Sequence, residues 1–271
     1  MRAMLESDEA QRVMVTAHSV ADAARAAILP YFRQPGLEAE NKLNSGFDPV
    51  TVADCAAEQA MRAVLAQQRP EDTVVGEEYG TQAGTSGLSW VLDPIDGTRG
   101  FMSGTPTWGV LVAVSDANGP LFGVIDQPYI GERFWGGLGQ SGMTGPQGAR
   151  DLAVRGTRGL DQAVLFTTFP EVGTAAEGAA FQEVARHVRL TRYGMDCYAY
   201  AMLAAGQIDL VIEAGLSNYD IHAPIAVIEA AGGIVTDWQG GPAHQGGRVI
   251  AAAGEEQHRA ALEILSRVPL D

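Results

Sequence analysis

The chain has 271 residues, of which 46% are hydrophobic and 19% charged, and its formal net charge at pH 7 is −15. This length can bury the core of one large domain or of two closely joined lobes. Because binding to a nucleic-acid backbone depends on Lys and Arg, so acidic a chain is not expected to bind nucleic acid. Any anionic ligand would need bound cations that reverse the local field.

The first residues of the chain are not expected to form a signal peptide. The first ten residues are mixed and acidic, without the basic start and apolar run of a signal peptide. No stretch approaches the roughly 18 apolar residues that a spanning helix needs, so no membrane association is expected. The two cysteines, Cys55 and Cys197, form no C-x-x-C pattern, which indicates a reducing, cytoplasmic location.

The first half of the chain combines helical and strand patterns. Apolar residues recur every three or four positions at Val13, Ala17, Val20, Ala24 and Ile28, as on one helix face. A second helix is predicted over about 53–67, where Thr51-x-x-Asp54 matches a capping box. Short β-branched and aromatic stretches then predict strands at 73–75, 89–92, 108–115, 121–125 and 133–136. Two helices beside an antiparallel meander are expected.

After about residue 142, predicted strands and helices alternate. Strands are expected at 164–168, 190–193, 208–213, 233–236 and 248–252, and helices at 177–188, 196–205, 220–231 and 255–267. This alternation predicts an α/β lobe with a largely parallel sheet. The turn-rich segment 142–148 divides the chain into lobes 1–146 and 147–271, and a site is expected in the cleft between them.

The densest chemical motif is Trp90-Val-Leu-Asp-Pro-Ile-Asp-Gly-Thr98. Asp93 ends an apolar strand, Pro94 forces a turn, and Asp96 follows three positions after Asp93. Mg²⁺ prefers carboxylate oxygens, and a two-metal site needs a carboxylate that bridges both ions. Gly97 would let backbone N–H groups approach a phosphate closely. Asp-Pro and Asp-Gly are also common turn formers, but the whole string after a buried strand favours a metal site.

Further carboxylates have both local and functional interpretations. Glu77 and Glu78 follow a strand and repel one another unless a cation neutralises them, so Glu77 is either a metal ligand or part of a solvated turn. Asp220 fits a helix N-cap, or a metal ligand supplied by the second lobe. Asp54 fits the capping box. His222, near the same helix start as Asp220, is expected to be exposed or locally bonded.

Taken together, these motifs resemble the inositol-monophosphatase family. The matching sequences occur in family order between about Tyr31 and Thr236: Asp48-Pro-Val-Thr-x-Ala-Asp54, Gly76-Glu-Glu78, Asp93-Pro-Ile-Asp-Gly-Thr98, and Tyr219-Asp220 followed by Ala231-Gly-Gly233. The resemblance implies hydrolysis of a small phosphate monoester. It also implies a layered αβαβα sandwich of the inositol-monophosphatase/fructose-bisphosphatase type, usually a homodimer, with an antiparallel N-terminal and a mostly parallel C-terminal sheet.

The resemblance also assigns roles to matching residues. Glu77, Asp93 and the carbonyl of Ile95 would bind a first Mg²⁺, and Asp93, Asp96 and Asp220 a second. Glu77 would also help to hold a weaker third ion. Thr98, hydrogen-bonded to Asp54, would orient the attacking water, and the amides of Gly97 and Thr98 would cradle the phosphate.

Departures from the inositol phosphatases make the chain more similar to the histidinol-phosphate phosphatase branch. They are Thr98-Arg99-x-Phe101-x-x-Gly104, Gly194-x-Asp196-Cys-Tyr-x-Tyr200 and Glu213-Ala-Gly-Leu216. Arg99, Asp196 and Glu213 become candidate substrate contacts, because histidinol phosphate carries an ammonium that would need carboxylates. Asp196 also fits an N-cap, and Glu213 an exposed strand end. His222-Ala-Pro224 is unusual in either branch.

Four alternatives share these motifs or retain the metal site. Three are enzymes that hydrolyse inositol-1-phosphate, fructose-1,6-bisphosphate or 3′-phosphoadenosine 5′-phosphate. A bisphosphate would need additional cations, for which Arg99, Arg189 and Arg192 are the loose candidates. The fourth is a metal-binding regulator that has lost catalysis, and the intact set of predicted ligands argues against it.

Overall fold

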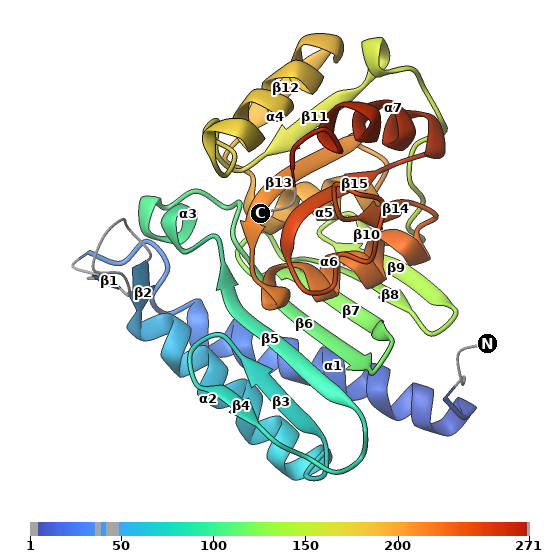
Figure 1. Cartoon of the computed structure of the whole chain (residues 1–271). Helices are drawn as coiled ribbons and strands as arrows, with labels where there is room; N and C mark the ends of the chain where they lie inside the picture. Colours follow the sequence, from blue (N-terminus) through green and yellow to red (C-terminus); the bar gives the residue numbers. More distant parts are fainter. Residues whose placement is uncertain (1–4, 36–38, 42–48, 270–271) are drawn as a thin grey trace.

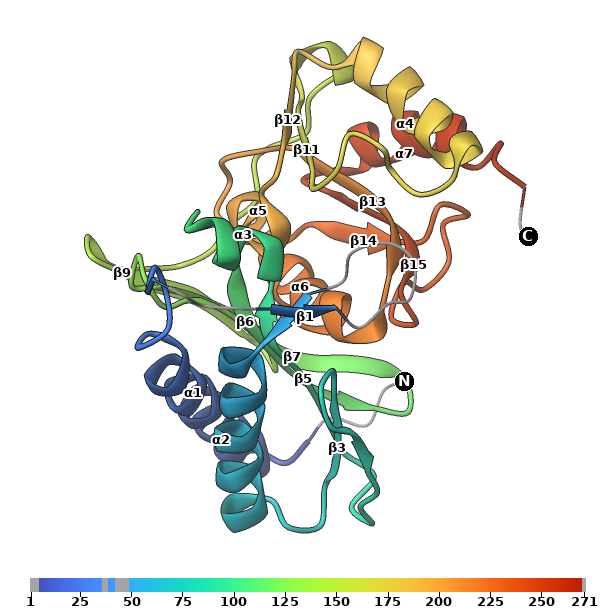
Figure 2. The same ribbon diagram turned by 90° about the vertical axis from the view of Figure 1, so that its left-hand side faces the viewer.

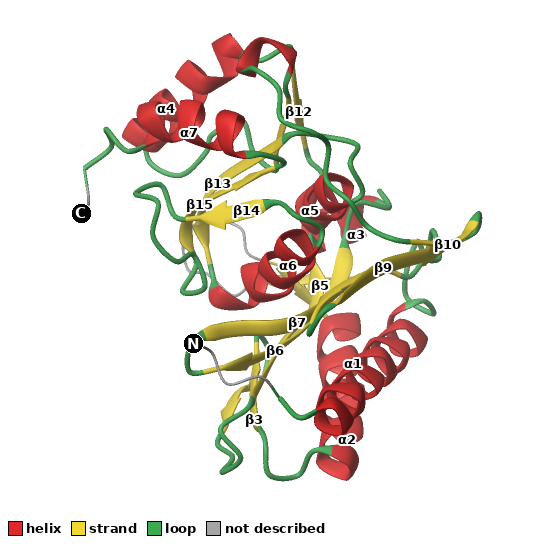
Figure 3. Cartoon of the chain, turned by 90° about the vertical axis from the view of Figure 1, so that its right-hand side faces the viewer, coloured by secondary structure: helices red, strands yellow, loops and turns green. Residues whose placement is uncertain are grey.

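The computed structural model describes residues 5–35, 39–41 and 49–269 (Figure 1). Asp48, the first residue of one family motif, lies outside the described residues. The described part stacks in five layers, in the order helices, sheet, helices, sheet, helices (Figure 3). The predicted layered α+β sandwich is therefore confirmed.

The first layer contains the two predicted N-terminal helices, α1 (Ser7–Ile28) and α2 (Val52–Gln68), which pack side by side beneath the first sheet (Figure 2). The five apolar residues that predicted α1 are all buried. Helix α2 begins with the predicted capping box, in which Thr51 Oγ1 accepts from the Ala53 amide and Asp54 Oδ2 accepts from the Thr51 amide. A short antiparallel pair, β1 (Ala39–Asn41) and β2 (Pro49–Thr51), precedes α2.

The second layer is an eight-stranded sheet in the order β10-β9-β8-β7-β6-β5-β3-β4. Only the β3–β5 pairing is parallel among the described pairings of this sheet. The five predicted strands are present, whereas β4, β9 and β10 were not predicted. The strands are β3 (Thr73–Gly76), β4 (Gly80–Gln82), β5 (Ser89–Asp96), β6 (Gly109–Asp116), β7 (Gly119–Gln127), β8 (Glu132–Gly137), β9 (Gln140–Gly145) and β10 (Gly148–Arg150).

The third layer contains α5 (Asp196–Ala204) and α6 (Asn218–Ala230). Buried His222 links α6 to its surroundings: Nδ1 lies 2.8 Å from Ser115 Oγ and Nε2 lies 2.7 Å from the His244 carbonyl oxygen. The expectations of exposure and of local bonding are both wrong, because His222 is buried and its two partners are distant in sequence. Pro224, inside α6, is also buried.

The fourth layer is a five-stranded sheet in the order β12-β11-β13-β15-β14, covered by α4 (Ala175–His187) and α7 (Glu255–Leu265) as the fifth layer. Four of the strands share one direction and β15 is reversed between β13 and β14, so the sheet is mixed. Its strands are β11 (Val164–Thr167), β12 (Leu190–Tyr193), β13 (Leu210–Leu216), β14 (Ile234–Thr236) and β15 (Gly247–Ala252); a short 3₁₀ helix, η1 (Leu160–Gln162), precedes β11.

Strand alternation distributes the apolar side chains of the first sheet between two cores. Val110, Val112 and Val114 of β6 pack in the core between the first sheet and helices α1 and α2. Leu111 and Ala113 pack in the central core with α5 and α6. Successive side chains of a strand point to opposite faces of the sheet. When both faces are covered, the sequence of the strand is therefore a continuous run of apolar residues. Among the described residues, no helix is long and apolar enough to cross a membrane.

Candidate active site

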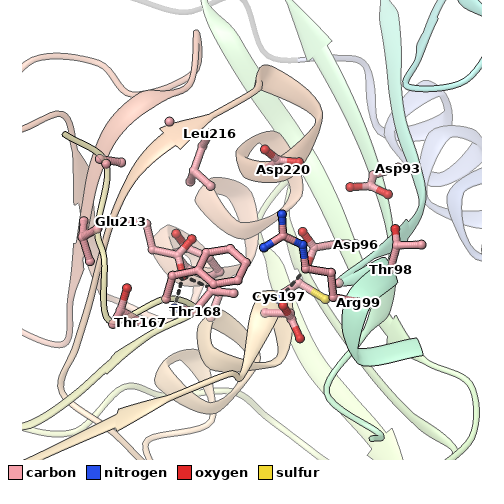
Figure 4. A pocket seen from close by; sticks show the side chains of 18 of the residues that line it. Asp93, Asp96, Thr98, Arg99, Thr167, Thr168, Cys197, Glu213, Leu216 and Asp220 are labelled. Carbon is pink, nitrogen blue, oxygen red and sulfur yellow. Dashed lines mark hydrogen bonds between the residues drawn. The ribbon is translucent and has the colours of Figure 1, made fainter. Parts of the chain in front are cut away.

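A cavity of ≈ 290 Å³ lies where the end of β5 meets α5, α6 and β13. Figure 4 shows Asp93, Asp96 and Asp220 on one side of it and Glu213 on the other. Among the described residues, the lining includes seven carboxylates (Glu77, Asp93, Asp96, Glu171, Asp196, Glu213 and Asp220) and one guanidinium, that of Arg99. Such a cavity would repel an anion unless cations were bound in it.

A β-bulge in β5 brings Asp93 and Asp96 to the same face. Asp93 pairs with Leu111 and Asp96 with Gly109, so β5 carries one more residue than β6 over this stretch. In a regular strand, residues three apart point to opposite faces, and one extra residue reverses this relation. Ile95 points instead into the core between the first sheet and helices α1 and α2. The Asp-Pro-Ile-Asp sequence therefore directs both carboxylates into the cavity.

Glu77 reaches Asp93 through the parallel pairing of β3 with β5. Gly76 pairs with Leu92, and the Glu77 amide donates to the Leu92 carbonyl at 3.2 Å, which places Glu77 beside Asp93. The turn after Glu77 is held by Glu58 of α2, a buried residue whose carboxylate accepts a hydrogen bond from the Glu78 amide at 2.7 Å. A side chain at position 76 would collide with this carboxylate, because an added Cβ would lie 2.0 Å from Glu58 Oε1.

Asp220 enters the site from the first turn of α6. Its Oδ2 accepts from the Ser217 amide at 2.6 Å, so the N-cap is Ser217 and Asp220 is the acidic third helical residue of a capping box. The N-cap interpretation of Asp220 is therefore wrong. Carboxylate oxygens of Asp93, Asp96 and Asp220 also lie within 4.8 Å of one another. The Asp220 side chain can therefore stabilise the start of α6 and also take part in the carboxylate cluster with Asp93 and Asp96.

Burial and repulsion between carboxylates raise the pKa values of Asp93 and Asp96. The pKa of Asp93 is raised well above its usual value, first by burial and then by the charges of Glu77 and Asp96. The pKa of Asp96 is raised by burial and by Asp220. A bound divalent cation would remove this repulsion, and hard cations prefer an all-oxygen donor set. The described carboxylates therefore fit a metal site.

The turn after β5 differs from the expected arrangement in one contact. Gly97 adopts φ = 85° and begins α3 (Thr98–Ser103). Thr98 Oγ1 donates to the Ile95 carbonyl at 3.1 Å, not to Asp54. Asp54 Oδ2 is held by the amide and hydroxyl of Thr51 at the start of α2. The predicted Thr98–Asp54 hydrogen bond is therefore wrong for this structure, because each side chain is bonded within its own turn.

Asp54 nevertheless retains an unused buried atom. Its Oδ1 has no hydrogen-bond partner among the described residues. Burial raises the pKa of Asp54 to about 6, and the charge of Glu77 contributes to the increase. Asp54 is thus electrostatically connected to the predicted metal ligands, although it does not line the cavity.

Asp196 lies in the cavity wall and does not cap its helix. It is the first residue of α5, at φ = 45°, and its Oδ2 accepts from Thr107 Oγ1 at 2.9 Å. An added Cβ on Gly97 would lie 2.7 Å from Asp196 Cγ. Glycine at position 97 therefore allows the turn after β5 to approach Asp196, and the N-cap interpretation of Asp196 is wrong.

Glu213 is buried, and its interpretation as an exposed strand end is wrong. Its Oε1 accepts from the amide and the hydroxyl of Thr168, at 2.9 and 2.7 Å. Burial raises the pKa of Glu213 to about 7. Across the cavity, the Arg99 guanidinium lies 4.7 Å from the centroid of the Phe169 ring, a cation–π contact between the two sides of the cleft.

Several residues of the site were not predicted. Thr107, Thr168, Phe169 and Glu58 act through contacts between segments distant in sequence. Tyr200 lines the cavity, although the sequence analysis named it only as the last residue of a family motif and gave it no role. A carboxylate-rich cleft between the two sheets fits a hydrolase that uses bound metal ions to act on an anionic ester.

Comparison with known proteins identifies the family. The sequence pattern described as "Inositol monophosphatase family" matches residues 9–269. The chain belongs to the inositol monophosphatase family, and it is a phosphatase, a hydrolase of phosphoric monoesters.

Two curated relatives and one solved structure illustrate the similarity. The chain is 38% identical to the chloroplastic bifunctional phosphatase IMPL2 of Arabidopsis thaliana, over 96% of this chain and 77% of that protein. It is 36% identical to a histidinol-phosphatase of Streptomyces coelicolor, over 88% and 91%. The structure of an inositol monophosphatase from Zymomonas mobilis superposes with a TM-score of 0.83 at 38% identity, covering 97% of this chain and 100% of that one.

Proposed function

We propose that this phosphatase is a cytoplasmic, Mg²⁺-dependent enzyme of histidine biosynthesis that hydrolyses L-histidinol phosphate to L-histidinol and inorganic phosphate. The observation that carries the proposal is the position of Asp196, a carboxylate held in the cavity wall by Thr107. The similarity to a histidinol-phosphatase at 36% identity supports it.

Two Mg²⁺ ions, and a weaker third, are proposed for the acidic side of the cavity. Glu77, Asp93 and the carbonyl of Ile95 would hold the first, and Asp93, Asp96 and Asp220 the second; Glu77 would also contribute to the third. The close approach of the Asp93, Asp96 and Asp220 oxygens supports this assignment. When bound, the ions lower the pKa of a coordinated water and stabilise charge on the leaving alcohol oxygen.

The chain's own groups then position the reactants. Thr98 is proposed to orient the attacking water, and its hydroxyl is held near the metal ligands by the Ile95 carbonyl. Asp54 is proposed to assist through its unpartnered Oδ1. The backbone amides of Gly97 and Thr98 would cradle the phosphate, and the left-handed turn at Gly97 supports this role.

The other wall would bind the rest of the substrate. Histidinol carries an ammonium and an imidazole, whereas inositol is a neutral polyol. Asp196 and Glu213 would face the ammonium, and Arg99 would contact the substrate at the cavity rim beside Phe169. A charge-assisted hydrogen bond of this kind contributes about 1.5–3 kcal/mol.

Inositol-1-phosphate is the second candidate substrate. An inositol-1-monophosphatase of Caulobacter vibrioides is 33% identical over 80% of this chain, and Glu213 could accept hydrogen bonds from inositol hydroxyls as well as from an ammonium. Bisphosphate substrates are less well supported, because Arg99 is the one cationic side chain among the described lining residues.

The deciding experiment is a phosphate-release assay with Mg²⁺ on four substrates: histidinol phosphate, inositol-1-phosphate, fructose-1,6-bisphosphate and 3′-phosphoadenosine 5′-phosphate. Histidinol phosphate should give the highest kcat/KM. Asp196→Ala should lower that value by about 10- to 150-fold while affecting inositol-1-phosphate much less. Faster hydrolysis of inositol-1-phosphate by the wild type would reject the substrate, and absence of hydrolysis of all four would contradict the proposed activity.

The assembly is proposed to be a homodimer, on the basis of the family resemblance. Each protomer would comprise lobes 1–146 and 147–271, with most metal ligands on the first and Asp220, Asp196 and Glu213 on the second. Strand β10 extends the first sheet slightly beyond residue 146. Light scattering coupled to gel filtration measures the mass directly, and a monomer at micromolar concentration would contradict the dimer.

A further inference from the structure

Tyr200 places a buried hydroxyl at the cavity without a partner. The residue is 3% exposed and belongs to the central core. Its hydroxyl makes no hydrogen bond with any residue that the structure describes, and the side chain lines the same cavity as Asp196 and Glu213. A buried hydroxyl without a partner destabilises a fold, whereas phenylalanine would fill the same space without this cost. Folding alone therefore does not account for the hydroxyl.

The position of Tyr200 on α5 relates it to Asp196. Asp196 is the first residue of α5 and Tyr200 follows it on the same helix, and both residues line the cavity. Thr107 occupies Asp196 Oδ2, and no described residue donates a hydrogen bond to Oδ1. Asp196 Oδ1 and the Tyr200 hydroxyl are thus two unused polar atoms of residues that line one cavity.

The charge around Tyr200 indicates the chemistry of a bound group. Asp196 and Glu213 line the cavity with Tyr200 and are not assigned to a metal ion. Two such carboxylates favour a cationic ligand group that offers several N–H donors. An ammonium meets both requirements, because it can donate to a carboxylate and to the phenol oxygen at once.

We propose that Tyr200 is a specificity-determining residue whose hydroxyl accepts a hydrogen bond from the substrate amino group that Asp196 binds. This inference rests on the proposed function, since it takes the substrate to be a phosphate ester of an amino alcohol. It places the amino group between two residues of one helix, and it distinguishes amino-alcohol phosphates from polyol phosphates.

The test compares Tyr200→Phe with wild type on three substrates: histidinol phosphate, 2-aminopropyl phosphate, which lacks the imidazole, and 3-(imidazol-4-yl)propyl phosphate, which lacks the amino group. The variant should lower kcat/KM about 10- to 150-fold on the two amino substrates. It should leave the third nearly unchanged. Its melting temperature should equal or exceed that of the wild type, because an unpartnered buried hydroxyl has been removed.

Tyr198→Phe is the matched control on the same helix. The Tyr198 hydroxyl donates to Glu132 Oε2 at 2.5 Å, away from the cavity. This variant should lower the melting temperature and leave the ranking of the three substrates unchanged.

Each failure has a distinct meaning. Equal kcat/KM of Tyr200→Phe and wild type on histidinol phosphate would overturn the role of Tyr200 and leave the proposed function standing. A loss that persists on the des-amino substrate would overturn the amino-group contact. A wild-type enzyme that prefers inositol-1-phosphate would overturn both the proposed substrate and this inference.

Discussion

The backbone amide of Cys197 donates to Asp96 Oδ2 at 2.5 Å. Asp96 ends β5 and Cys197 lies in the first turn of α5, so this bond connects a predicted metal ligand on one sheet to a helix in the central layer. The amide dipoles at a helix N-terminus favour nearby negative charge. The bond therefore offsets part of the repulsion that Asp96 experiences from Asp220.

Asp93→Asn should nearly abolish activity. Asp93 is the carboxylate that both proposed metal ions share. Its loss should remove several kcal/mol of transition-state stabilisation, which lowers kcat by about 1000-fold or more. Mg²⁺-dependent phosphate release measures the effect. Asp96→Asn and Asp220→Asn serve as comparisons, because each would weaken the binding of one ion. A higher Mg²⁺ concentration should partly restore their activity. Wild-type turnover by Asp93→Asn would show that the two-metal assignment is wrong.

Thr98→Ala should lower kcat about 100-fold with little change in KM, since a misplaced nucleophile affects the chemical step. Asp54→Asn should lower kcat as well, and should also cost about 1 kcal/mol of stability through the capping box at Thr51. Measuring kcat and melting temperature on both variants separates the two effects. If Asp54→Asn loses stability but keeps kcat, Asp54 is a helix cap without a role in the reaction.

Glu213 should make the metal-free protein less stable as pH rises. Its pKa is about 7 in the folded protein against a usual 4.5, so the folded state retains the proton after the unfolded chain has lost it. Relative to Glu213→Gln, the wild type should therefore lose stability between about pH 4.5 and 7. Each pKa unit corresponds to about 1.4 kcal/mol, giving about 3 kcal/mol at pH 8.

Urea unfolding of both proteins in EDTA at several pH values measures this difference. Gln at position 213 keeps an acceptor for Thr168, which makes it a suitable reference. A constant difference in stability across the range would mean that Glu213 has the same proton affinity in the folded and unfolded chains.

His222→Ala should destabilise the protein and weaken its response to Mg²⁺. The change leaves Ser115 Oγ and the His244 carbonyl without their shared partner, at a cost of about 2–3 kcal/mol. Because His222 lies on α6 two residues after Asp220, half-maximal activity should need more Mg²⁺. Thermal unfolding and a Mg²⁺ titration check both effects. Ser115→Ala, which removes one of the two contacts, should produce a smaller change. If His222→Ala has the melting temperature and the Mg²⁺ response of the wild type, His222 does not hold α6 in place.

The order and type of most elements were predictable, because periodicity and capping are local properties. The apolar spacing that predicted α1 and the Thr51–Asp54 box of α2 depend on residues within a few turns of one another. The unpredicted strands β4, β9 and β10 are short and rich in Gly or polar residues. Their pairing with neighbours, rather than their own composition, makes them strands.

The sequence alone determined the chemical identity of the acidic cluster. The motif from Asp93 to Thr98 carries two carboxylates, a Pro and a Gly in a spacing that produces the bulge and the left-handed turn. The tertiary structure decided the remaining contacts: Asp196 bonds Thr107 instead of capping α5, Glu213 is buried against Thr168, and Thr98 bonds Ile95 rather than Asp54. These outcomes depend on which segments meet across the cleft. A side chain with both a local and a distant partner available takes the geometry that packing permits, and local sequence does not specify that geometry.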